Sequence, residues 1–139
     1  MPDRIDAKES DYLYVETSQL PNAGKGLYTS IDIFKGEVIA LFKGKRLSEK
    51  AAASLAKQNK DGYFINMLDG SILDSRLVNC YAKYANDSQG LGKTKFLYNA
   101  EISLDDDEHV CLIALKKIKS GEEIFCSYGK KYWQKFKAR

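Results

Sequence analysis

Short apolar runs separated by polar turns follow one another along this chain. Residues 12–15, Tyr-Leu-Tyr-Val, are rich in β-forming side chains and predict a first strand. Residues 38–42 and 110–115 are continuous apolar runs of the length of a buried strand. Three further extended pieces are expected at residues 27–28, 96–102 and 124–126. The pattern therefore indicates many short strands.

Helical spacing is found in three segments only. Ser48 is a favourable N-cap, and apolar residues recur at intervals of four from position 47 to position 55, so residues 49–58 are expected to form an amphipathic helix. Residues 78–85 predict a single helical turn. Residues 130–137 predict a second helix, because three aromatic side chains are spaced to share one face.

The dipeptide Asp69-Gly70 is the strongest short hairpin signal in the chain, and it lies between apolar pieces at residues 63–65 and 72–73. Many short strands, few helices and no strand–helix alternation predict an α+β, mainly β fold. The length of 139 residues favours one domain, expected at residues 11–139. The polar residues 1–10 are expected to be a loose N-terminal segment.

The formal net charge is +3, and the cations are not gathered into one long run, so the charge does not favour nucleic-acid binding. The densest basic stretch is the end of the chain, with Lys130, Lys131, Lys135, Lys137 and Arg139. It is interpreted as a solvated helix face or as a surface for an anionic partner. A small basic β domain that binds nucleic acid through this tail remains an alternative function.

Three cysteines, Cys80, Cys111 and Cys126, are present without C-x-C or C-x-x-C spacing. This number and spacing argue against a disulfide framework and against a zinc cluster made of cysteines, so no metal site is expected. Cys111 and Cys126 lie in apolar runs and are expected to be buried thiols. A reducing interior is the default, so an intracellular, cytoplasmic protein is expected, with a nuclear one as the option for a eukaryotic chain. No run of 18 apolar residues predicts a membrane span.

Residues 86–94, NDSQGLGKT, end like a phosphate-binding loop, G-x-x-x-x-G-K-[ST]. The position that requires the first glycine is Asp87, whose carboxylate would repel a phosphate. The lysine must also open a helix, whereas the residues after Lys93 have an extended pattern. Nucleotide hydrolysis is therefore rejected, and attention moves to Asn86, Asp87 and Ser88.

Seven short segments carry a pattern that extends over residues 20–133. In order they read AGKGL at 23–27, IFKGEVI at 33–39, LFKG at 41–44, ILDS at 72–75, AKYANDS at 82–88, NAEI at 99–102 and IKSGEEIFCSYG at 118–129. Together and in this order they resemble the motifs of the SET domain, the family of S-adenosylmethionine-dependent protein lysine methyltransferases. Each segment alone is weak evidence, whereas their order makes the resemblance specific.

The resemblance implies a SET-domain β-clip fold of short strands with one or two short helices. In this fold the segment at 86–88 and the segment at 127–129 cross in a pseudoknot, which periodicity alone does not predict. The expected type is the small single domain in which no cysteine-rich module follows Trp133, and pairing as a homodimer stays open. The implied function is transfer of a methyl group from S-adenosylmethionine to a lysine of a protein or peptide substrate.

The resemblance also assigns roles to individual residues. Tyr128 is implied as the catalytic residue, whose hydroxyl positions the lysine amine and the methyl group. The cofactor-binding set is Ala23, Lys25, Gly26, Lys83, Tyr84, Asn86, Asp87 and Trp133. The substrate channel is implied at Phe42, Ile102, Cys126 and Tyr128.

Methyl transfer to lysine requires a neutral amine, and deprotonation at pH 7 costs roughly 4.6 kcal/mol for a pKa near 10.4. A sulfonium about 4 Å away disfavours the ammonium by roughly 4 kcal/mol at an effective dielectric near 20. No strong protein base is therefore required, and the single histidine, His109, is expected to be structural.

Three positions depart from the family pattern. Asp87 stands in place of a histidine, Phe42 in place of a tyrosine, and Cys126 in place of an aromatic residue. The small thiol leaves room beside the amine, which predicts di- or trimethylation. The first two departures leave a second alternative, a SET-like domain that binds cofactor or peptide without turnover.

Overall fold

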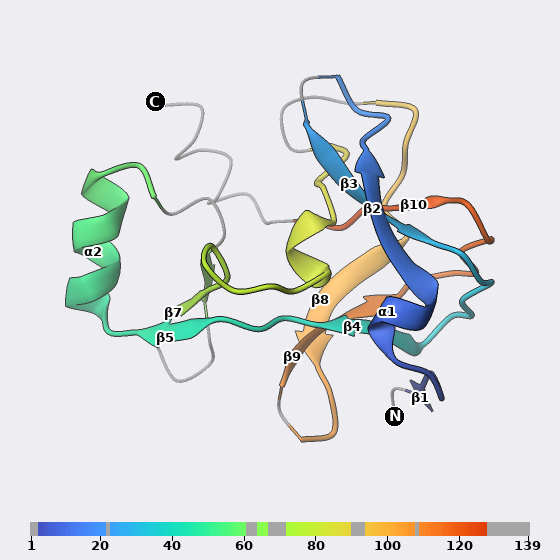
Figure 1. Ribbon diagram of the computed structural model, residues 1–139, viewed down its shortest axis with the longest axis horizontal. Coiled ribbons are helices and arrows are strands. Elements are labelled where there is room, and N and C mark those ends of the chain that lie inside the picture. Colours follow the sequence, from blue (N-terminus) through green and yellow to red (C-terminus); the bar gives the residue numbers. More distant parts are fainter. Residues whose placement is uncertain are drawn as a thin grey trace.

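Three small sheets form the framework of the described chain, and a short 3-10 helix contacts two of them (Figure 1). The computed structural model describes residues 3–21, 23–60, 64–66, 72–89, 94–107 and 109–127. Within these ranges strands predominate and the helices are short. The α+β, mainly β fold expected from the sequence is confirmed.

The largest sheet contains both strands predicted from continuous apolar runs. Its order is β1 (Asp3–Arg4), β4 (Glu37–Leu41), β9 (Val110–Ala114) and β8 (Ala100–Leu104). β1 runs parallel to β4, and the other pairs are antiparallel. Ile39 of β4 and Leu112 of β9 are fully buried, which explains why these two strands are apolar without alternation.

The second sheet has the order β10 (Glu123–Ile124), β3 (Lys25–Thr29) and β2 (Leu13–Thr17). All its pairs are antiparallel, and Leu27 lies between Val15 on one side and Ile124 on the other. Apolar side chains of the two larger sheets meet in one buried cluster. This cluster includes Tyr12, Leu13, Leu27, Ile33, Ile39, Leu112, Ile118 and Ile124.

The N-terminal residues differ from the loose segment expected at 1–10, because they contain β1 and the short helix α1 (Glu9–Tyr12). The predicted first strand starts one residue later than expected, because Tyr12 closes this helix. Its hydroxyl donates a 2.7 Å hydrogen bond to the backbone carbonyl of Ile39. These contacts are made with residues distant in the sequence, so the local polar composition did not reveal them.

The third sheet, with the helix beside it, lies at the opposite end of the molecule from β2 and β3 (Figure 1). It consists of β5 (Lys45–Leu47), β7 (Ile72–Asp74) and β6 (Phe64–Asn66), and helix α2 (Glu49–Lys57) follows β5. Ser48 caps the helix as predicted, accepting a 3.2 Å hydrogen bond from the Ala51 N–H. β6 and β7 pair antiparallel as the hairpin prediction requires, while Asp69 and Gly70 lie outside the described residues.

Two close contacts attach the third sheet to the connection between β4 and β5. A Cβ at Gly44 would lie 2.3 Å from the backbone oxygen of Asp74, so only glycine fits there. The Ser75 hydroxyl donates a 2.6 Å hydrogen bond to the carbonyl of Lys43. The sheet is therefore joined to the core by backbone packing at this point.

Segments far apart in the sequence interlock next to the 3-10 helix η1 (Ala82–Tyr84). Asn86 forms a parallel bridge with Phe125, and the Cys126 N–H donates to the Asn86 carbonyl at 3.0 Å. Asn99 bonds the same segment twice, donating to the Glu123 carbonyl at 2.9 Å and accepting from the Phe125 N–H at 2.8 Å. This arrangement places residues 125–126, which lead to one segment of the expected pseudoknot, beside Asn86 of the other, while Tyr128 and Gly129 lie outside the described residues.

The cysteines and the C-terminal residues were also the subject of predictions. Cys111 and Cys126 are buried and free, which confirms the prediction of buried thiols, and Cys80 is buried and free as well. No helix in the described ranges has the length and apolarity needed to cross a membrane. The helix predicted at residues 130–137 lies outside the described residues.

One buried carboxylate joins β10, β3 and the end of β2. Glu123 is 2% exposed, and its oxygens accept hydrogen bonds from the Ser18 hydroxyl at 2.6 Å, the Gln19 N–H at 2.8 Å and the Tyr28 hydroxyl at 3.2 Å. A Cβ at Gly26 would lie 2.3 Å from this carboxylate. Gly26 is therefore required by the packing of Glu123.

We expect Gly26→Ala to destabilise the protein by about 1–3 kcal/mol, because a methyl group would overlap the Glu123 carboxylate. Urea unfolding measures the free-energy change. The same substitution is expected to cost less in a Glu123→Ala background, where the overlapping group is absent. Equal costs in both backgrounds would contradict this account. Glu122→Ala, at the exposed neighbouring position, serves as the control and is expected to change stability little.

Candidate functional site

Two segments predicted to bind the cofactor are joined directly in the structure. The Asn86 side-chain amide donates a 2.8 Å hydrogen bond to the carbonyl of Lys25. Lys25 opens β3, whereas Asn86 follows η1, sixty-one positions later in the chain. The loop at residues 23–26 and Asn86 therefore converge on one place.

The conformation of this loop depends on two supports. Gly24 has a φ of +70°, a left-handed conformation that glycine adopts without strain. The Gly24 carbonyl accepts a 2.8 Å hydrogen bond from the Ser18 N–H. The Ser18 hydroxyl in turn donates to the Glu123 carboxylate. The loop is therefore connected through Ser18 both to the end of β2 and to Glu123 of β10.

The segment that leads to the predicted catalytic residue lies against Asn86. Cys126 is fully buried beside Ala85, and burial raises the pKa of its thiol, which keeps the group neutral. Ser127 is the last described residue of this segment. Tyr128 and Trp133 lie outside the described residues, so their predicted roles remain predictions.

Phe42 and Ile102, two of the predicted channel residues, lie on neighbouring parts of the largest sheet. The Phe42 N–H donates to the Val110 carbonyl at 2.9 Å, and Ile102 pairs with Leu112. Since Val110 and Leu112 are two positions apart on β9, Phe42 and Ile102 are expected on the same face of the sheet. Both pack against the buried cluster.

Lys83 and Tyr84 are adjacent to each other, but the lysine is directed at a backbone turn. Its ammonium donates to the carbonyls of Ser75 at 3.3 Å and Val78 at 3.0 Å, and lies 5.4 Å from the centre of the Tyr84 ring. These contacts connect η1 to the residues that follow β7. A structural role for Lys83 is therefore visible, while its predicted cofactor role is untested.

Asp87, in the position of the family histidine, turns its side chain inward. It is 7% exposed, and one carboxylate oxygen accepts hydrogen bonds from the Tyr98 hydroxyl at 2.7 Å and the Gln89 N–H at 3.0 Å. Burial, followed by the hydrogen bond to the Asp87 carboxylate, raises the pKa of Tyr98 to about 12. The phenol is therefore protonated at neutral pH.

Sequence reasoning missed Glu123 and Tyr98, which support the site without belonging to the predicted set. For Glu123 a signal was available, since this carboxylate directly precedes the apolar run at 124–126 and a buried charge needs donors. Tyr98 gave no such signal, because its partner is eleven positions away across a loop.

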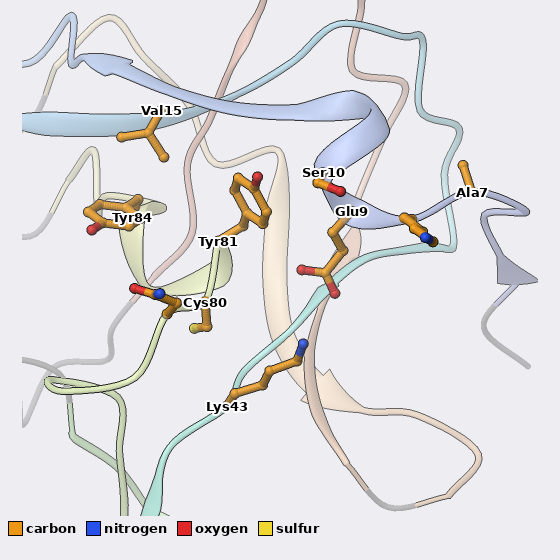
Figure 2. Close-up of a pocket in the computed structure, with 10 residues that line it drawn as sticks. Ala7, Glu9, Ser10, Val15, Lys43, Cys80, Tyr81 and Tyr84 are labelled. Carbon is orange, nitrogen blue, oxygen red and sulfur yellow. The ribbon is translucent and has the colours of Figure 1, made fainter.

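A separate cavity of about 690 Å³ lies between α1 and the residues before Asn86. Figure 2 shows Tyr81 and Tyr84 on one side, Glu9 and Ser10 on the other, and Lys43 extending toward Glu9. Of the predicted cofactor residues that the structure describes, only Tyr84 lines it. The cavity is therefore distinct from the place where Asn86 meets Lys25.

The turn between β8 and β9 gathers three groups of the kind that bind metal ions, Asp105, Asp107 and His109. The Arg4 guanidinium already bonds Asp105 at 3.3 Å and Asp107 at 3.0 Å. The Asp105 carboxylate also accepts hydrogen bonds from the Asp107 and His109 N–H groups, both at 2.9 Å. These contacts explain the cluster structurally, because they attach Arg4 of β1 to the turn between β8 and β9.

Comparison with known proteins places this geometry in a family. The family model described as SET domain matches residues 24–129. The chain is 28% identical over 123 residues to the histone-lysine N-methyltransferase EZH2 of Chaetomium thermophilum, covering 81% of this chain and 8% of that protein. It is 25% identical over 130 residues to the histone-lysine N-methyltransferase SETD7 of Halocynthia roretzi, covering 88% of this chain and 33% of that protein.

Solved structures agree on the fold. A chain of ctPRC2 in an autoinhibited conformation bound to S-adenosylmethionine has a TM-score of 0.71 and 26% identity, over 91% of this chain and 16% of that chain. A humanized mutant of the Chaetomium thermophilum Polycomb Repressive Complex 2 bound to an inhibitor has a TM-score of 0.67 and 24% identity, over 84% of this chain and 15% of that chain. The match of the family model over residues 24–129 and the convergence of the predicted motifs lead to one conclusion: the chain belongs to the SET domain family.

Proposed function

We propose that this protein is an S-adenosylmethionine-dependent protein lysine N-methyltransferase. The observation that carries the proposal is the hydrogen bond from Asn86 to Lys25, which joins the two family segments assigned to the cofactor. The relatives named above as histone-lysine N-methyltransferases support the reaction type. A structural relative bound to S-adenosylmethionine supports the cofactor.

The residues at the site suit this cofactor. The Ser88 hydroxyl is buried and has no hydrogen-bond partner among the residues that the structure describes, next to the Asn86–Asp87 segment. Buried polar groups without a partner are rare and indicate an absent water or ligand. Asn86 is only partly buried, and its amide offers a second N–H and an oxygen beyond the bond to Lys25.

When bound, the cofactor would supply a reactive methyl group on a positively charged sulfur. Asn86 and the backbone of residues 23–26 would hold it, and Tyr128 would orient the lysine amine. Phe42 and Ile102 present apolar side chains to the proposed channel. Such surroundings disfavour the charged ammonium and lower the pKa of the substrate amine, which favours the neutral form that reacts.

The proposed catalytic role of Tyr128 is tested by Tyr128→Phe. We expect the rate of methyl transfer to fall about 10²-fold or more, as for loss of other preorganised donors, with the fold unchanged. Labelled methyl transfer from the cofactor to a mixture of histones and basic proteins provides the assay. Tyr14→Phe, in β2 where the ring stacks on Tyr28, is the matched control and should keep full activity. Equal activity of the two variants would remove Tyr128 from catalysis.

Asn86→Ala is expected to weaken S-adenosylmethionine binding about tenfold, because it removes hydrogen bonds worth roughly 1 kcal/mol each. Calorimetric titration measures the dissociation constant. Asn79→Ala, in the separate cavity, is the matched control and should leave it unchanged. The reverse result, with only Asn79→Ala weakening binding, would move the cofactor to that cavity.

The extent of methylation is expected to reach the di- or trimethyl state, because Cys126 replaces an aromatic side chain and leaves room near the amine. Mass spectrometry of a methylated peptide over a time course measures this. Cys126→Leu, which adds volume at the same position, should shift the products toward monomethyl. A wild-type reaction that stops at monomethyl would refute the expectation.

Binding without turnover is the competing function, and the replacement of the family histidine by Asp87 favours it. It predicts a calorimetric signal with S-adenosylmethionine and no labelled product with any basic protein tested. Labelled product from the wild-type chain would exclude it.

A further inference from the structure

Tyr98 and its neighbour Asn99 connect three segments at the edge of the proposed site. The Tyr98 hydroxyl donates a 2.7 Å hydrogen bond to the Asp87 carboxylate. The Asn99 N–H donates to the Phe125 carbonyl at 3.1 Å, and the centres of the Phe96 and Phe125 rings lie 5.3 Å apart. Residues 96–99 therefore contact both Asp87 and Phe125.

These residues lie where two segments of the proposed site pair with each other. Asp87 directly follows Asn86, whose carbonyl accepts from the Cys126 N–H at 3.0 Å. Cys126 directly follows Phe125, to which Asn99 is bonded, and lies two positions before Tyr128 in the sequence. The bond from Tyr98 to Asp87 therefore adds a second connection, through residues 98 and 99, between the two segments that pair at Asn86.

The Asp87 carboxylate is also held by a second hydrogen bond. The same carboxylate oxygen accepts from the Gln89 N–H at 3.0 Å. The Gln89 side-chain amide donates to the carbonyls of Thr94 at 3.1 Å and Phe96 at 2.6 Å, in the segment that leads to Tyr98. Both ends of the loop are thereby tied, so Tyr98 has little freedom to follow a moving partner.

We propose that Asp87 and Tyr98 form a positioning pair that, through Asn99, holds residues 125–126 against residues 86–88 and so fixes the backbone that leads to Tyr128. A hydrogen bond to a carboxylate is roughly twice as strong as a neutral one, and the Asp87 acceptor is buried. Asp87 stands where the family has a histidine, and its carboxylate accepts the hydrogen bond from the Tyr98 phenol. It rests on the proposed function only for its effect on catalysis.

Misplacing a reacting group by about 1 Å costs up to 10²-fold in rate. Loss of the pair should therefore lower kcat more than it raises KM, because ground-state binding does not use the phenol. Asp87→Asn keeps an oxygen that can accept from Tyr98, whereas Asp87→Ala does not. The conservative variant is thus expected to retain most of the rate.

The experiment compares Tyr98→Phe with Tyr12→Phe. Both remove a phenol hydroxyl that donates a 2.7 Å hydrogen bond, but Tyr12 bonds the Ile39 carbonyl away from the site. Hydrogen exchange at the Cys126 amide, thermal unfolding, kcat and KM are measured for both variants, for Asp87→Ala and for Asp87→Asn.

We expect Tyr98→Phe and Asp87→Ala to speed exchange at the Cys126 amide about tenfold beyond Tyr12→Phe at equal loss of global stability. We also expect kcat to fall about tenfold, with KM changed less than about twofold and with Asp87→Asn close to wild type. Exchange at Cys126 that follows global stability equally in both phenylalanine variants would overturn the proposal. An inactive wild type would end the proposed function alone, because the exchange result still decides whether the pair positions this segment.

Discussion

A carboxylate buried away from water must find its hydrogen-bond donors within the protein, and this constraint organises the site. Glu123 obtains donors from Ser18, Gln19 and Tyr28, that is, from the end of β2, the loop after it and β3. Phe125, directly after β10, pairs with Asn86. One satisfied charge therefore sets the position of the loop at 23–26 and of its partner segment together.

The fold was predictable as far as local pattern specifies it. The apolar runs located β4 and β9, and the Ser48 cap located α2, because burial and capping leave a signal in neighbouring residues. The β1 and α1 elements were not predicted. Their order depends on pairing with β4 and on the bond from Tyr12 to Ile39, which join residues distant in the sequence.

The candidate site divides in the same way. The meeting of Lys25 and Asn86 followed from the family resemblance, since the motifs occur in the family's order. The reason for glycine at position 26 did not, because it is the packing of a distant carboxylate. The inward turn of Asp87 was also invisible in the sequence. The sequence shows that a histidine side chain is missing at position 87. Only the structure shows that the Asp87 carboxylate bonds the Tyr98 hydroxyl instead.

The tight fit at Gly44 has a consequence for which substitutions can alter the shape of the molecule. β5, β7 and α2 meet the core next to a main-chain contact that tolerates no side chain, whereas most of α2 is solvent-exposed. A methyl group at position 44 would push the backbone of β7 away from the connection after β4 and tilt the sheet as a unit. Exchanges on the outer face of α2 would change the surface and leave that orientation intact.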